Sequence, residues 1–313
     1  MDVRGQRIAV VDFGTNSTRL LVADVVDGAV EELERRTDVT RLGEGVDRSG
    51  RLAEAAMGRV FETVARYREV IDGLGGAGRA IGVATSAVRD SENGDDFRAA
   101  LCDRYGIDVE VIAGEEEARL TFLGATADRS PDESALVIDI GGGSTEYVVG
   151  TPASAPSFRV SAKLGSVRQT ERHLESDPPS DQQVSDLEAE ANEILNAEVP
   201  PHVREQVTAG IAVAGTATSL AAIDLELEPH DPDRVHGHRL ETDTCRRLLG
   251  QLAAVPVAQR RETRGLDPDR APTIVAGAAI LLQSIVAFGL DAVEVSEADL
   301  LHGAALHAAW GRR

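Results

Sequence analysis

Two short stretches of the sequence carry an aspartate, a glycine and a Ser-Thr pair in the same order. Residues 10–22 read VVDFGTNSTRLLV and residues 137–149 read VIDIGGGSTEYVV, and the two align without a gap. Each pattern predicts a buried strand, a glycine-containing hairpin turn and a second strand. Because the repeat is spaced by about half the chain, it predicts two similar halves whose turns face one ligand.

The second of these turns offers donors for a phosphate and ligands for a cation. Its three consecutive glycines, residues 141–143, let backbone N–H groups approach an anion, because no Cβ stands in the way and φ can be positive. Ser144 adds a hydroxyl group. Asp139 and Glu146 are carboxylates suited to Mg²⁺ or Mn²⁺, which commonly accompany phosphate. The alternative is a tight hairpin that simply needs glycine, and no P-loop lysine follows.

The first turn repeats most of this chemistry. It has Asp12 at the end of its first strand, then Asn16, Ser17 and Thr18 as donors, and Arg19 where the second turn has a glutamate. Two matched turns of this kind can clamp opposite ends of a phosphoanhydride. The repetition therefore favours a phosphate site over two unrelated hairpins.

Charged residues between the two turns could complete a site. Glu115, Glu116 and Glu117 open a predicted helix, where carboxylates interact favourably with the helix dipole, so a solvated charge is the default for each. One that points into a cleft could orient a water as general base, and composition leaves open which one. Arg89 follows a run of small residues and is suited to bidentate phosphate contact, with a surface ion pair as the alternative.

Three further segments have weaker patterns. Residues 163–168 form a basic, glycine-containing patch, and Arg41 lies close to two glycines. Residues 215–218 precede a predicted helix and either bind phosphate or cap that helix. Residues 230–238 contain three histidines and two aspartates; a metal cluster is one interpretation, but proline and glycine in this segment favour a plain polar loop.

The hydrophobic pattern predicts alternating strands and helices in both halves. A polar, proline-containing segment at residues 128–134 predicts a domain boundary. Asp27-Gly28 predicts a hairpin turn, and residues 85–89 are expected to form a loop that leads into a helix. Ser180 and Gln183 have the spacing of a capping box at the start of a long helix. The expected strands, besides those that flank the second turn, cover residues 8–11, 18–25, 29–37, 79–84, 107–112, 207–213 and 293–295. The expected helices cover residues 52–71, 93–103, 114–124 and 299–310. Three more helices are expected to begin near residue 180, after residue 218 and at residue 272.

Length and charge limit the classes of function. The 313 residues suffice for two domains with their own cores. A net charge of −21 argues against nonspecific nucleic-acid binding, although a local field can still bind a polyanion. The longest apolar stretch, residues 271–290, contains polar and small residues and predicts a buried helix instead of a membrane span. With Cys102 and Cys245 as the only cysteines and no signal-peptide pattern, we expect a cytoplasmic protein.

Taken in order, these motifs resemble the exopolyphosphatase/guanosine pentaphosphate phosphohydrolase family. The resemblance spans nearly the whole chain, and the order of its motifs is more specific than any single turn. The segments that carry it are residues 12–19, 41–45, 84–89 with Asn93, 114–119, 139–146, 164–168, 214–216 and 272–281.

The resemblance implies an α/β fold of the actin-like ATPase type, found in sugar kinases, Hsp70 and actin. It consists of two ribonuclease-H-like domains with an interdomain cleft. Domain I would comprise residues 1–127 plus about 300–313, and domain II residues 128–299. The implied reaction is Mg²⁺-dependent hydrolysis of the terminal phosphoanhydride of inorganic polyphosphate, releasing orthophosphate. The extra C-terminal helical domains of longer members are absent, which suggests short chains as substrates; a homodimer is consistent with the resemblance.

Roles for individual residues follow from their positions in the family's motifs. Glu117 would be the catalytic base, with Asp139 positioning the metal or the water and Glu146 and Asp12 assisting the metal. The predicted phosphate-binding residues are Asn16, Ser17, Thr18, Arg89, Gly141, Gly142, Gly143 and Ser144.

Alternatives and one departure accompany this prediction. Guanosine pentaphosphate also ends in a phosphoanhydride, so the sequence does not separate the two substrates. An ATP-dependent kinase or ATPase of the same fold would need an adenosine pocket and an acceptor-activating aspartate, for which no separate candidate is found. A silent polyphosphate sensor is disfavoured because Glu117, Asp139 and Glu146 are all retained. Leu301 and His302 stand where the family usually has Arg-Glu, which predicts a lost or pH-sensitive contact.

Overall fold

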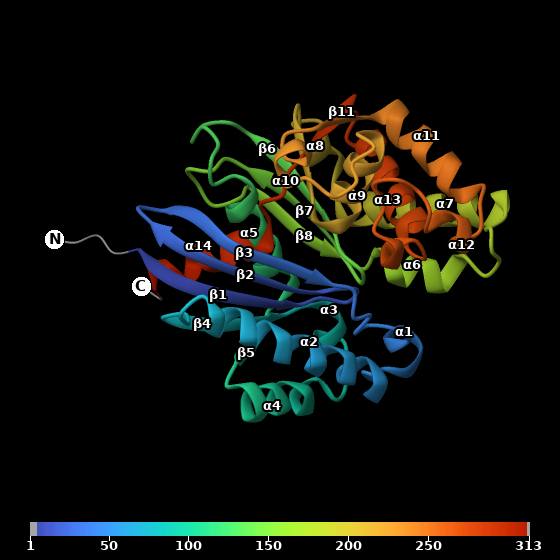
Figure 1. Ribbon diagram of the computed structural model, residues 1–313. Coiled ribbons are helices and arrows are strands. Elements are labelled where there is room, and N and C mark those ends of the chain that lie inside the picture. Colours follow the sequence, from blue (N-terminus) through green and yellow to red (C-terminus); the bar gives the residue numbers. More distant parts are fainter. Residues whose placement is uncertain (1–4, 312–313) are drawn as a thin grey trace. The chain divides into compact units, whose positions relative to one another are not determined.

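The computed structural model describes residues 5–311, which fall into two compact units (Figure 1). Unit 1 comprises Met1–Asp128 and Leu300–Arg313, and unit 2 comprises Arg129–Asp299. Each unit is built around its own β-sheet. Within residues 5–311, no helix is both long enough and apolar enough to cross a membrane.

The sheet of unit 1 has five strands in the order β3-β2-β1-β4-β5. The first three strands pair antiparallel, and β4 and β5 continue the sheet parallel to β1. The predicted Asp27-Gly28 hairpin connects β2 to β3, and both residues have positive φ (51° and 85°). The strands are β1 Gln6–Phe13, β2 Thr18–Val26, β3 Ala29–Asp38, β4 Arg79–Ala84 and β5 Asp108–Val111.

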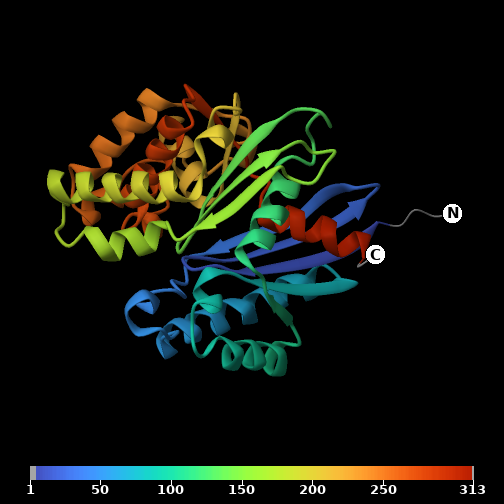
Figure 2. The same ribbon diagram turned by 180° about the vertical axis from the view of Figure 1, so that it is seen from behind.

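Both faces of this sheet are covered by helices, as Figures 1 and 2 show from opposite sides. Along β1, Ala9, Val11 and Phe13 join one core with α2 and α4, while Ile8 and Val10 join a second core with α5 and α14. This alternation reflects the two-residue period of a strand. The helices are α1 Val46–Ser49, α2 Glu54–Gly73, α3 Ser86–Arg89, α4 Gly94–Tyr105, α5 Gly114–Ala125 and α14 Leu300–Trp310.

The sheet of unit 2 has six strands in the order β10-β11-β9-β6-β7-β8. Apart from the edge strand β10, the order matches unit 1, with an antiparallel β6-β7-β8 hairpin pair followed by the parallel strands β9 and β11. This shared topology is ribonuclease-H-like, so the predicted fold class is confirmed. The strands are β6 Ala135–Ile140, β7 Thr145–Gly150, β8 Phe158–Ala162, β9 Gly210–Val213, β10 Arg239–Glu241 and β11 Ala292–Val295.

The core of unit 2 is organised around α13, the buried helix predicted from residue 272. This helix packs against α7, α11, α6 and α9, and its Ser284 bonds the buried hydroxyl of Tyr147 at 2.8 Å. The predicted capping box is confirmed at α7, where Ser180 and Gln183 exchange hydrogen bonds. The helices are α6 Ser166–His173, α7 Asp181–Glu198, α8 Pro201–Arg204, α9 Ala214–Asp224, α10 Pro232–Val235, α11 Thr242–Ala253, α12 Val257–Arg260, the 3₁₀ helix η1 Pro268–Arg270 and α13 Ile274–Ala287.

Two predicted loops contain short helices. Residues 85–89 were expected to be irregular, but α3 forms there because Arg89 N donates to Thr85 O at 3.0 Å. Residues 229–238 contain α10, which begins at a proline and is capped by the side chain of Asp231. In both places a single turn closes over residues too few to show a helical period.

Candidate functional site

The repeated sequence is also a repeated structure. In the first turn, Gly14 N donates to Ser17 O at 3.0 Å; in the second, Gly141 N donates to Ser144 O at the same distance. A Cβ added to Gly14 would lie 2.9 Å from Ser17 O, and one added to Gly141 would lie 3.2 Å from Ser144 O. At the same position of both turns, a side chain would press on the carbonyl that the glycine faces, more severely in the first turn than in the second.

Both turns present amide groups that the protein itself does not use. Among residues 5–311, the N–H groups of Asn16, Ser17, Gly142 and Gly143 donate to no acceptor. Ser17 Oγ is buried and likewise has no partner among these residues. Buried N–H groups normally find an acceptor, so donors clustered in this way indicate an anion or ordered water.

The two turns differ in the residue pair at their base. Asp12 lies opposite Arg19 in the ladder between β1 and β2, and Arg19 Nε donates to Asp12 Oδ2 at 2.8 Å. In unit 2, Asp139 lies opposite Glu146, and Glu146 Oε1 accepts a bond from Ser161 at 2.6 Å. The first carboxylate is thus paired with a guanidinium, whereas the second stands beside another carboxylate.

The carboxylate pair of unit 2 fits a divalent cation. Asp139 is 6% exposed and Glu146 is 1% exposed, and directly opposed residues project from the same face of a sheet. Two like charges in this position repel each other, and a hard cation with oxygen ligands relieves that repulsion. Asp12 fits such a cation less well, since one of its oxygens already accepts from Arg19.

The structure separates the three consecutive glutamates at the start of α5. Glu115 is exposed to solvent. Glu116 is held by Arg119 in a bidentate pair, with Nε–Oε2 at 2.8 Å and Nη2–Oε1 at 2.7 Å, and these hydrogen bonds raise the pKa of Arg119. Glu117 is buried, with 7% of its surface exposed. Of the three, Glu117 therefore has the protected position that a general base needs.

Arg89 lies beside Glu117 within unit 1. Its Nη1 donates to Glu117 Oε2 at 3.1 Å and to Ile112 O at 3.0 Å. Its Nε and Nη2 donate to no acceptor in the part of the chain that the structure describes. The predicted base and the predicted phosphate-binding arginine are thus brought together, and the arginine keeps donors for a ligand.

Thr18, predicted to bind phosphate, and Asn93, part of the segment that carries the family resemblance, both make internal contacts. The hydroxyl of Thr18, predicted to bind phosphate, is fully buried and lies 2.9 Å from that of Thr40. Asn93 pairs with the backbone of Leu52, accepting at Oδ1 (2.8 Å) and donating from Nδ2 (3.0 Å). Asn93 thereby joins the loop before α2 to the start of α4.

Comparison with known sequences identifies a family for this chain. A sequence model described as the Ppx/GppA phosphatase family matches residues 21–309. The chain belongs to this family. The similar protein Exopolyphosphatase 2 of Mycobacterium tuberculosis is 37% identical over 319 residues, covering 96% of this chain and 98% of the relative.

Solved structures with similar sequences share the whole fold. The structure of an Aquifex aeolicus PPX-GPPA enzyme has a TM-score of 0.80 at 31% identity, covering 96% of this chain and 99% of that one. An exopolyphosphatase from Cytophaga hutchinsonii has a TM-score of 0.88 at 28% identity, covering 98% and 99%. This chain is therefore a Ppx/GppA protein over its full alignment, not in one motif alone.

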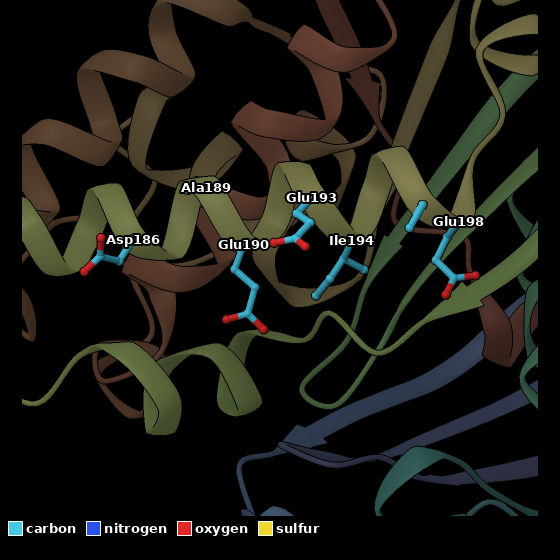
Figure 3. Close-up of a pocket in the computed structure, with 7 residues that line it drawn as sticks. Asp186, Ala189, Glu190, Glu193, Ile194 and Glu198 are labelled. Carbon is cyan, nitrogen blue, oxygen red and sulfur yellow. The ribbon is translucent and has the colours of Figure 1, made fainter.

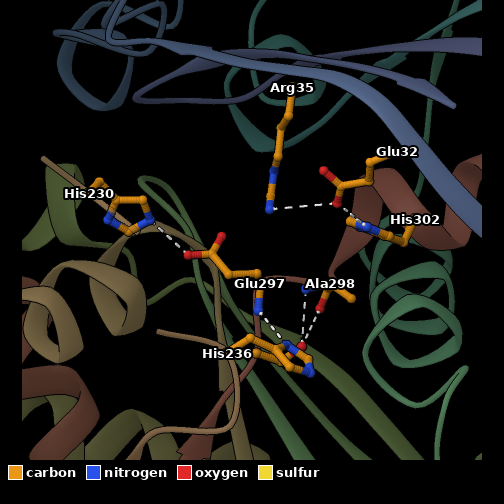
Figure 4. A network of polar contacts seen from close by, with 8 residues as sticks. Glu32, Arg35, His230, His236, Glu297, Ala298 and His302 are labelled. Carbon is orange, nitrogen blue, oxygen red and sulfur yellow. Dashed lines mark hydrogen bonds and ion pairs between the residues drawn. The ribbon is translucent and has the colours of Figure 1, made fainter. Parts of the chain in front are cut away.

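The three histidines of residues 230–238 do not share one ligand position: His230 contacts the carboxylate of Glu297, His236 contacts the backbone N–H of Glu297, and His238 contacts Asp224. In Figure 4, His230 Nε2 lies 2.9 Å from Glu297 Oε1, and Glu297 N donates to His236 Nδ1 at 3.3 Å. His238 Nε2 lies 3.1 Å from Asp224 Oδ2. Among the described residues, no group of three or more His, Cys, Asp or Glu has the geometry of a metal site.

His302, at which the sequence predicts a lost or pH-sensitive contact, has an acidic partner in unit 1. Its Nε2 lies 2.7 Å from Glu32 Oε1, and Arg35 Nη1 lies 3.9 Å from the same oxygen (Figure 4). His302 belongs to α14 and Glu32 to β3. The histidine therefore ties the last helix to the edge strand of the sheet.

Two surface hollows of unit 2 do not suit a polyanion. One hollow of about 510 Å³ lies along α7, and Figure 3 shows carboxylates of Asp186, Glu190, Glu193 and Glu198 around it. These negative charges would repel a phosphate chain. A second groove of about 710 Å³ between α7, α11 and α13 is lined mainly by small and apolar side chains. The turns remain the better candidates for phosphate binding in the Ppx/GppA protein.

Proposed function

We propose that this protein hydrolyses the terminal phosphoanhydride bond of inorganic polyphosphate and releases orthophosphate. The observation that carries the proposal is the second turn, where the unused amides of Gly142 and Gly143 lie beside the opposed carboxylates Asp139 and Glu146. Anion donors next to cation ligands suit a metal-associated phosphate. The naming of a 37% identical relative as an exopolyphosphatase supports polyphosphate as the substrate.

The residues divide the work of phosphoryl transfer, which depends mostly on positioning and charge stabilisation. The amides of residues 142 and 143, with Ser144, hold phosphate oxygens in unit 2. In unit 1, Asn16, Ser17 and the remaining donors of Arg89 do the same. A divalent cation held by Asp139 and Glu146, with Asp12 assisting, would supply neutralisation of the phosphate charge.

Glu117 acts on the attacking water. The water oxygen forms a bond to the terminal phosphorus while the bridging P–O bond breaks, and Glu117 accepts the proton that the water loses. The shortened chain leaves with the electrons of the broken bond and takes up a proton. Arg89 holds the carboxylate in place through its Nη1 bond at 3.1 Å, so one orientation of the base is maintained.

The test is release of orthophosphate by purified protein with Mg²⁺. Short polyphosphate, long polyphosphate, guanosine pentaphosphate and ATP are offered in parallel, and each is repeated with EDTA. We expect polyphosphate to be cleaved, with short chains preferred, and EDTA to stop the reaction. Preferential cleavage of guanosine pentaphosphate would instead favour the second activity considered for this family, and no release from any substrate would refute a hydrolase.

A matched pair of variants tests the site itself. Asp139→Asn removes a carboxylate from the second turn and should abolish most turnover and raise the Mg²⁺ requirement. Asp186→Asn removes a carboxylate from the hollow along α7 in the same unit and should change neither. Equal activity of the two variants would remove Asp139 from the proposed site. Gel filtration of the same samples tests the predicted homodimer.

A further inference from the structure

In each unit, a second segment of the chain is hydrogen-bonded to the phosphate-binding turn. In unit 1 it is the first bracing segment, residues 41–43, with sequence RLG; in unit 2 it is the second bracing segment, residues 163–168, which begins KLG. The first bracing segment begins shortly after β3, and the second begins directly after β8; each of these is the third strand of its unit. Each also buries its leucine, Leu42 at 0% and Leu164 at 1% exposure.

The second bracing segment binds the carbonyl groups of the second turn. Ser166, Val167 and Arg168 all donate to it from the start of α6. The bonds are Ser166 N to Gly141 O (2.9 Å), Val167 N to Gly142 O (2.9 Å), Arg168 N to Gly142 O (3.1 Å) and Arg168 Nε to Gly143 O (2.8 Å). Because α6 has no side-chain cap, the turn's carbonyls also satisfy the otherwise unused N–H groups of this helix start.

The first bracing segment does the same from a loop. Arg41 N donates to Asn16 O and Gly43 N donates to Thr15 O, both at 2.8 Å. Arg59 of α2 fixes this loop from behind, with its Nε 2.7 Å from Thr40 O. The atoms differ from those in unit 2, but in both units the acceptors are carbonyls of the turn.

The threonine after each turn reinforces the connection. Thr18 bonds the hydroxyl of Thr40, which directly precedes the first bracing segment, and Thr145 Oγ1 donates to Leu164 O within the second. Thr18 and Thr145 occupy equivalent places in the repeat. Both bonds are buried, so these hydroxyls serve the bracing segments.

Binding the carbonyls determines where the amides point. A trans peptide group is planar, with its C=O and N–H on opposite sides. The carbonyls of residues 141, 142 and 143 share peptide groups with the N–H groups of residues 142, 143 and 144. Carbonyls held toward α6 therefore turn those N–H groups away from α6, and the carbonyls of residues 15 and 16 orient the N–H groups of Asn16 and Ser17 in the same way.

Close contact makes glycine necessary in both bracing segments. A Cβ on Gly165 would lie 2.3 Å from Gly142 O and 2.4 Å from the carbonyl carbons of residues 142 and 143. A Cβ on Gly43 would lie 2.3 Å from Thr15 Cγ2. The first obstacle is backbone, so the turn itself would have to move; the second is a side-chain methyl, which has more freedom to adjust.

We propose that the two bracing segments aim the amide groups of the turns at the substrate's phosphates, and that Gly43, Gly165 and Arg168 are positioning residues for the reaction. This inference rests on the proposed function, because it takes the turns as the phosphate site. It assigns a role to two segments that no turn motif contains.

The experiment compares glycine-to-alanine variants that differ in their surroundings. Gly165→Ala and Gly43→Ala press on the turns, while Gly250→Ala in α11 and Gly58→Ala in α2 add a methyl where no atom lies within 4 Å. Two quantities are measured on each: kcat and KM for tripolyphosphate with Mg²⁺, and the affinity for orthophosphate by calorimetry. Melting temperatures report whether each variant folds.

We expect Gly165→Ala to lower kcat/KM on the order of 10²-fold, a loss that a misplacement of about 1 Å can cause. Its orthophosphate affinity should fall in parallel, and Gly43→Ala should show a smaller loss of both. The two control variants should match the wild type within about twofold. A folded Gly165→Ala variant with wild-type affinity and kinetics would overturn the inference.

Arg168 provides a test that does not depend on a steric clash. Lysine keeps the positive charge but places its ammonium where Cζ of arginine lies, so it lacks a donor at Nε. We expect Arg168→Lys and Arg168→Met to lose similar amounts of orthophosphate affinity. Full affinity in Arg168→Lys would show that charge alone matters and would overturn the positioning role of the Nε bond.

The measurement of orthophosphate affinity distinguishes this inference from the proposed function. Wild-type protein that binds orthophosphate but cleaves no substrate would refute the proposed hydrolysis, while weakened binding in Gly165→Ala would still support the bracing segments. If the wild type cleaves polyphosphate and Gly165→Ala has unchanged binding and kinetics, the proposed hydrolysis would stand and the role of the bracing segments would be refuted.

Discussion

Replacing Glu117 by glutamine removes the proposed base while keeping its shape. The glutamine side chain can still accept a hydrogen bond from Arg89 Nη1, which lies 3.1 Å from Glu117 Oε2 and also donates to Ile112 O. The amide cannot take a proton from water at neutral pH. The perturbation therefore separates proton transfer from the packing of α5.

The size of both effects can be estimated from these contacts. General-base catalysis contributes roughly 10²–10⁴-fold, which is about 2.7–5.4 kcal/mol of barrier at about 1.36 kcal/mol per tenfold. Folding stability should change far less. A charge-assisted hydrogen bond becomes a neutral one, a difference on the order of 1 kcal/mol. The melting temperature should fall by no more than a few degrees.

The assay is orthophosphate release from tripolyphosphate, read with thermal unfolding of the same sample. Glu116→Gln is the matched control, since it makes the same chemical change one residue earlier in the chain. Its carboxylate pairs with Arg119 and is 38% exposed, so the loss of stability should be at most about 1 kcal/mol. Its rate should stay within about twofold of the wild type.

Two results would refute the assignment. If folded Glu117→Gln retained a tenth or more of the wild-type kcat, the base would have to be another group. If Glu116→Gln lost activity in its place, the bidentate pair with Arg119 would have to open during the reaction. Loss of activity in Glu117→Gln together with loss of folding would be resolved by Glu117→Asp, which keeps the carboxylate on a shorter side chain.

Three further predictions concern stability and reactivity. Burial raises the pKa of Tyr67 and Tyr147 above that of tyrosine in an unfolded chain, which ionises near pH 10. The free energy of unfolding should therefore keep the full contribution of both tyrosines below about pH 10, and above that pH it should fall by up to about 1.36 kcal/mol per pH unit for each tyrosine. Urea titrations at several pH values should show a smaller slope for the Tyr→Phe variants. Burial raises the pKa of the Cys245 thiol to about 12, while Cys102 is exposed; a thiol reagent should therefore modify Cys102 rapidly in the native protein and Cys245 only after denaturation. Ser180→Ala removes the capping box of α7 and should lower the free energy of unfolding by about 1 kcal/mol, measured by urea denaturation.

Local pattern was sufficient to predict much of the fold. The buried run before each turn, the Asp27-Gly28 hairpin and the capping box at Ser180 depend on neighbouring residues, and the structure has all of them. Strand β8 and helices α6 and α11 were not predicted. Helix α11 does place Cys245, Leu248 and Leu252 on one buried face at helical spacing, so its signal was present in the sequence.

The choice among the three glutamates shows where local pattern stops. Glu117 lies three and four residues before Leu120 and Thr121, which are both buried, so helical spacing could have favoured it. Glu116 lies four residues before Leu120 as well. Only the position of α5 on the sheet, and the arginine that each carboxylate meets, separates the two.

Contacts between distant segments could not be predicted from spacing. The aspartate of the first turn is 31 residues before Gly43, and that of the second is 26 residues before Gly165. A gapless alignment of the turns therefore does not extend to the bracing segments, even though RLG and KLG are similar. Their role depends on hydrogen bonds to turn carbonyls, which a sequence pattern does not contain.

The two halves of this duplicated fold have diverged at one ladder position. Arg19 neutralises Asp12 in unit 1, while Glu146 adds a second negative charge beside Asp139 in unit 2. We infer that the cation is therefore held mainly by the second turn and that Asp12 of the first turn contributes less, although both turns keep unused amides and the same kind of brace. Exchanging the residues should test this: Glu146→Arg would pair with Asp139 as Arg19 does with Asp12, and it should remove the Mg²⁺ dependence of ligand binding while leaving the amides of Gly142 and Gly143 able to bind orthophosphate. Unchanged Mg²⁺ binding in that variant, measured by calorimetry, would place the cation elsewhere.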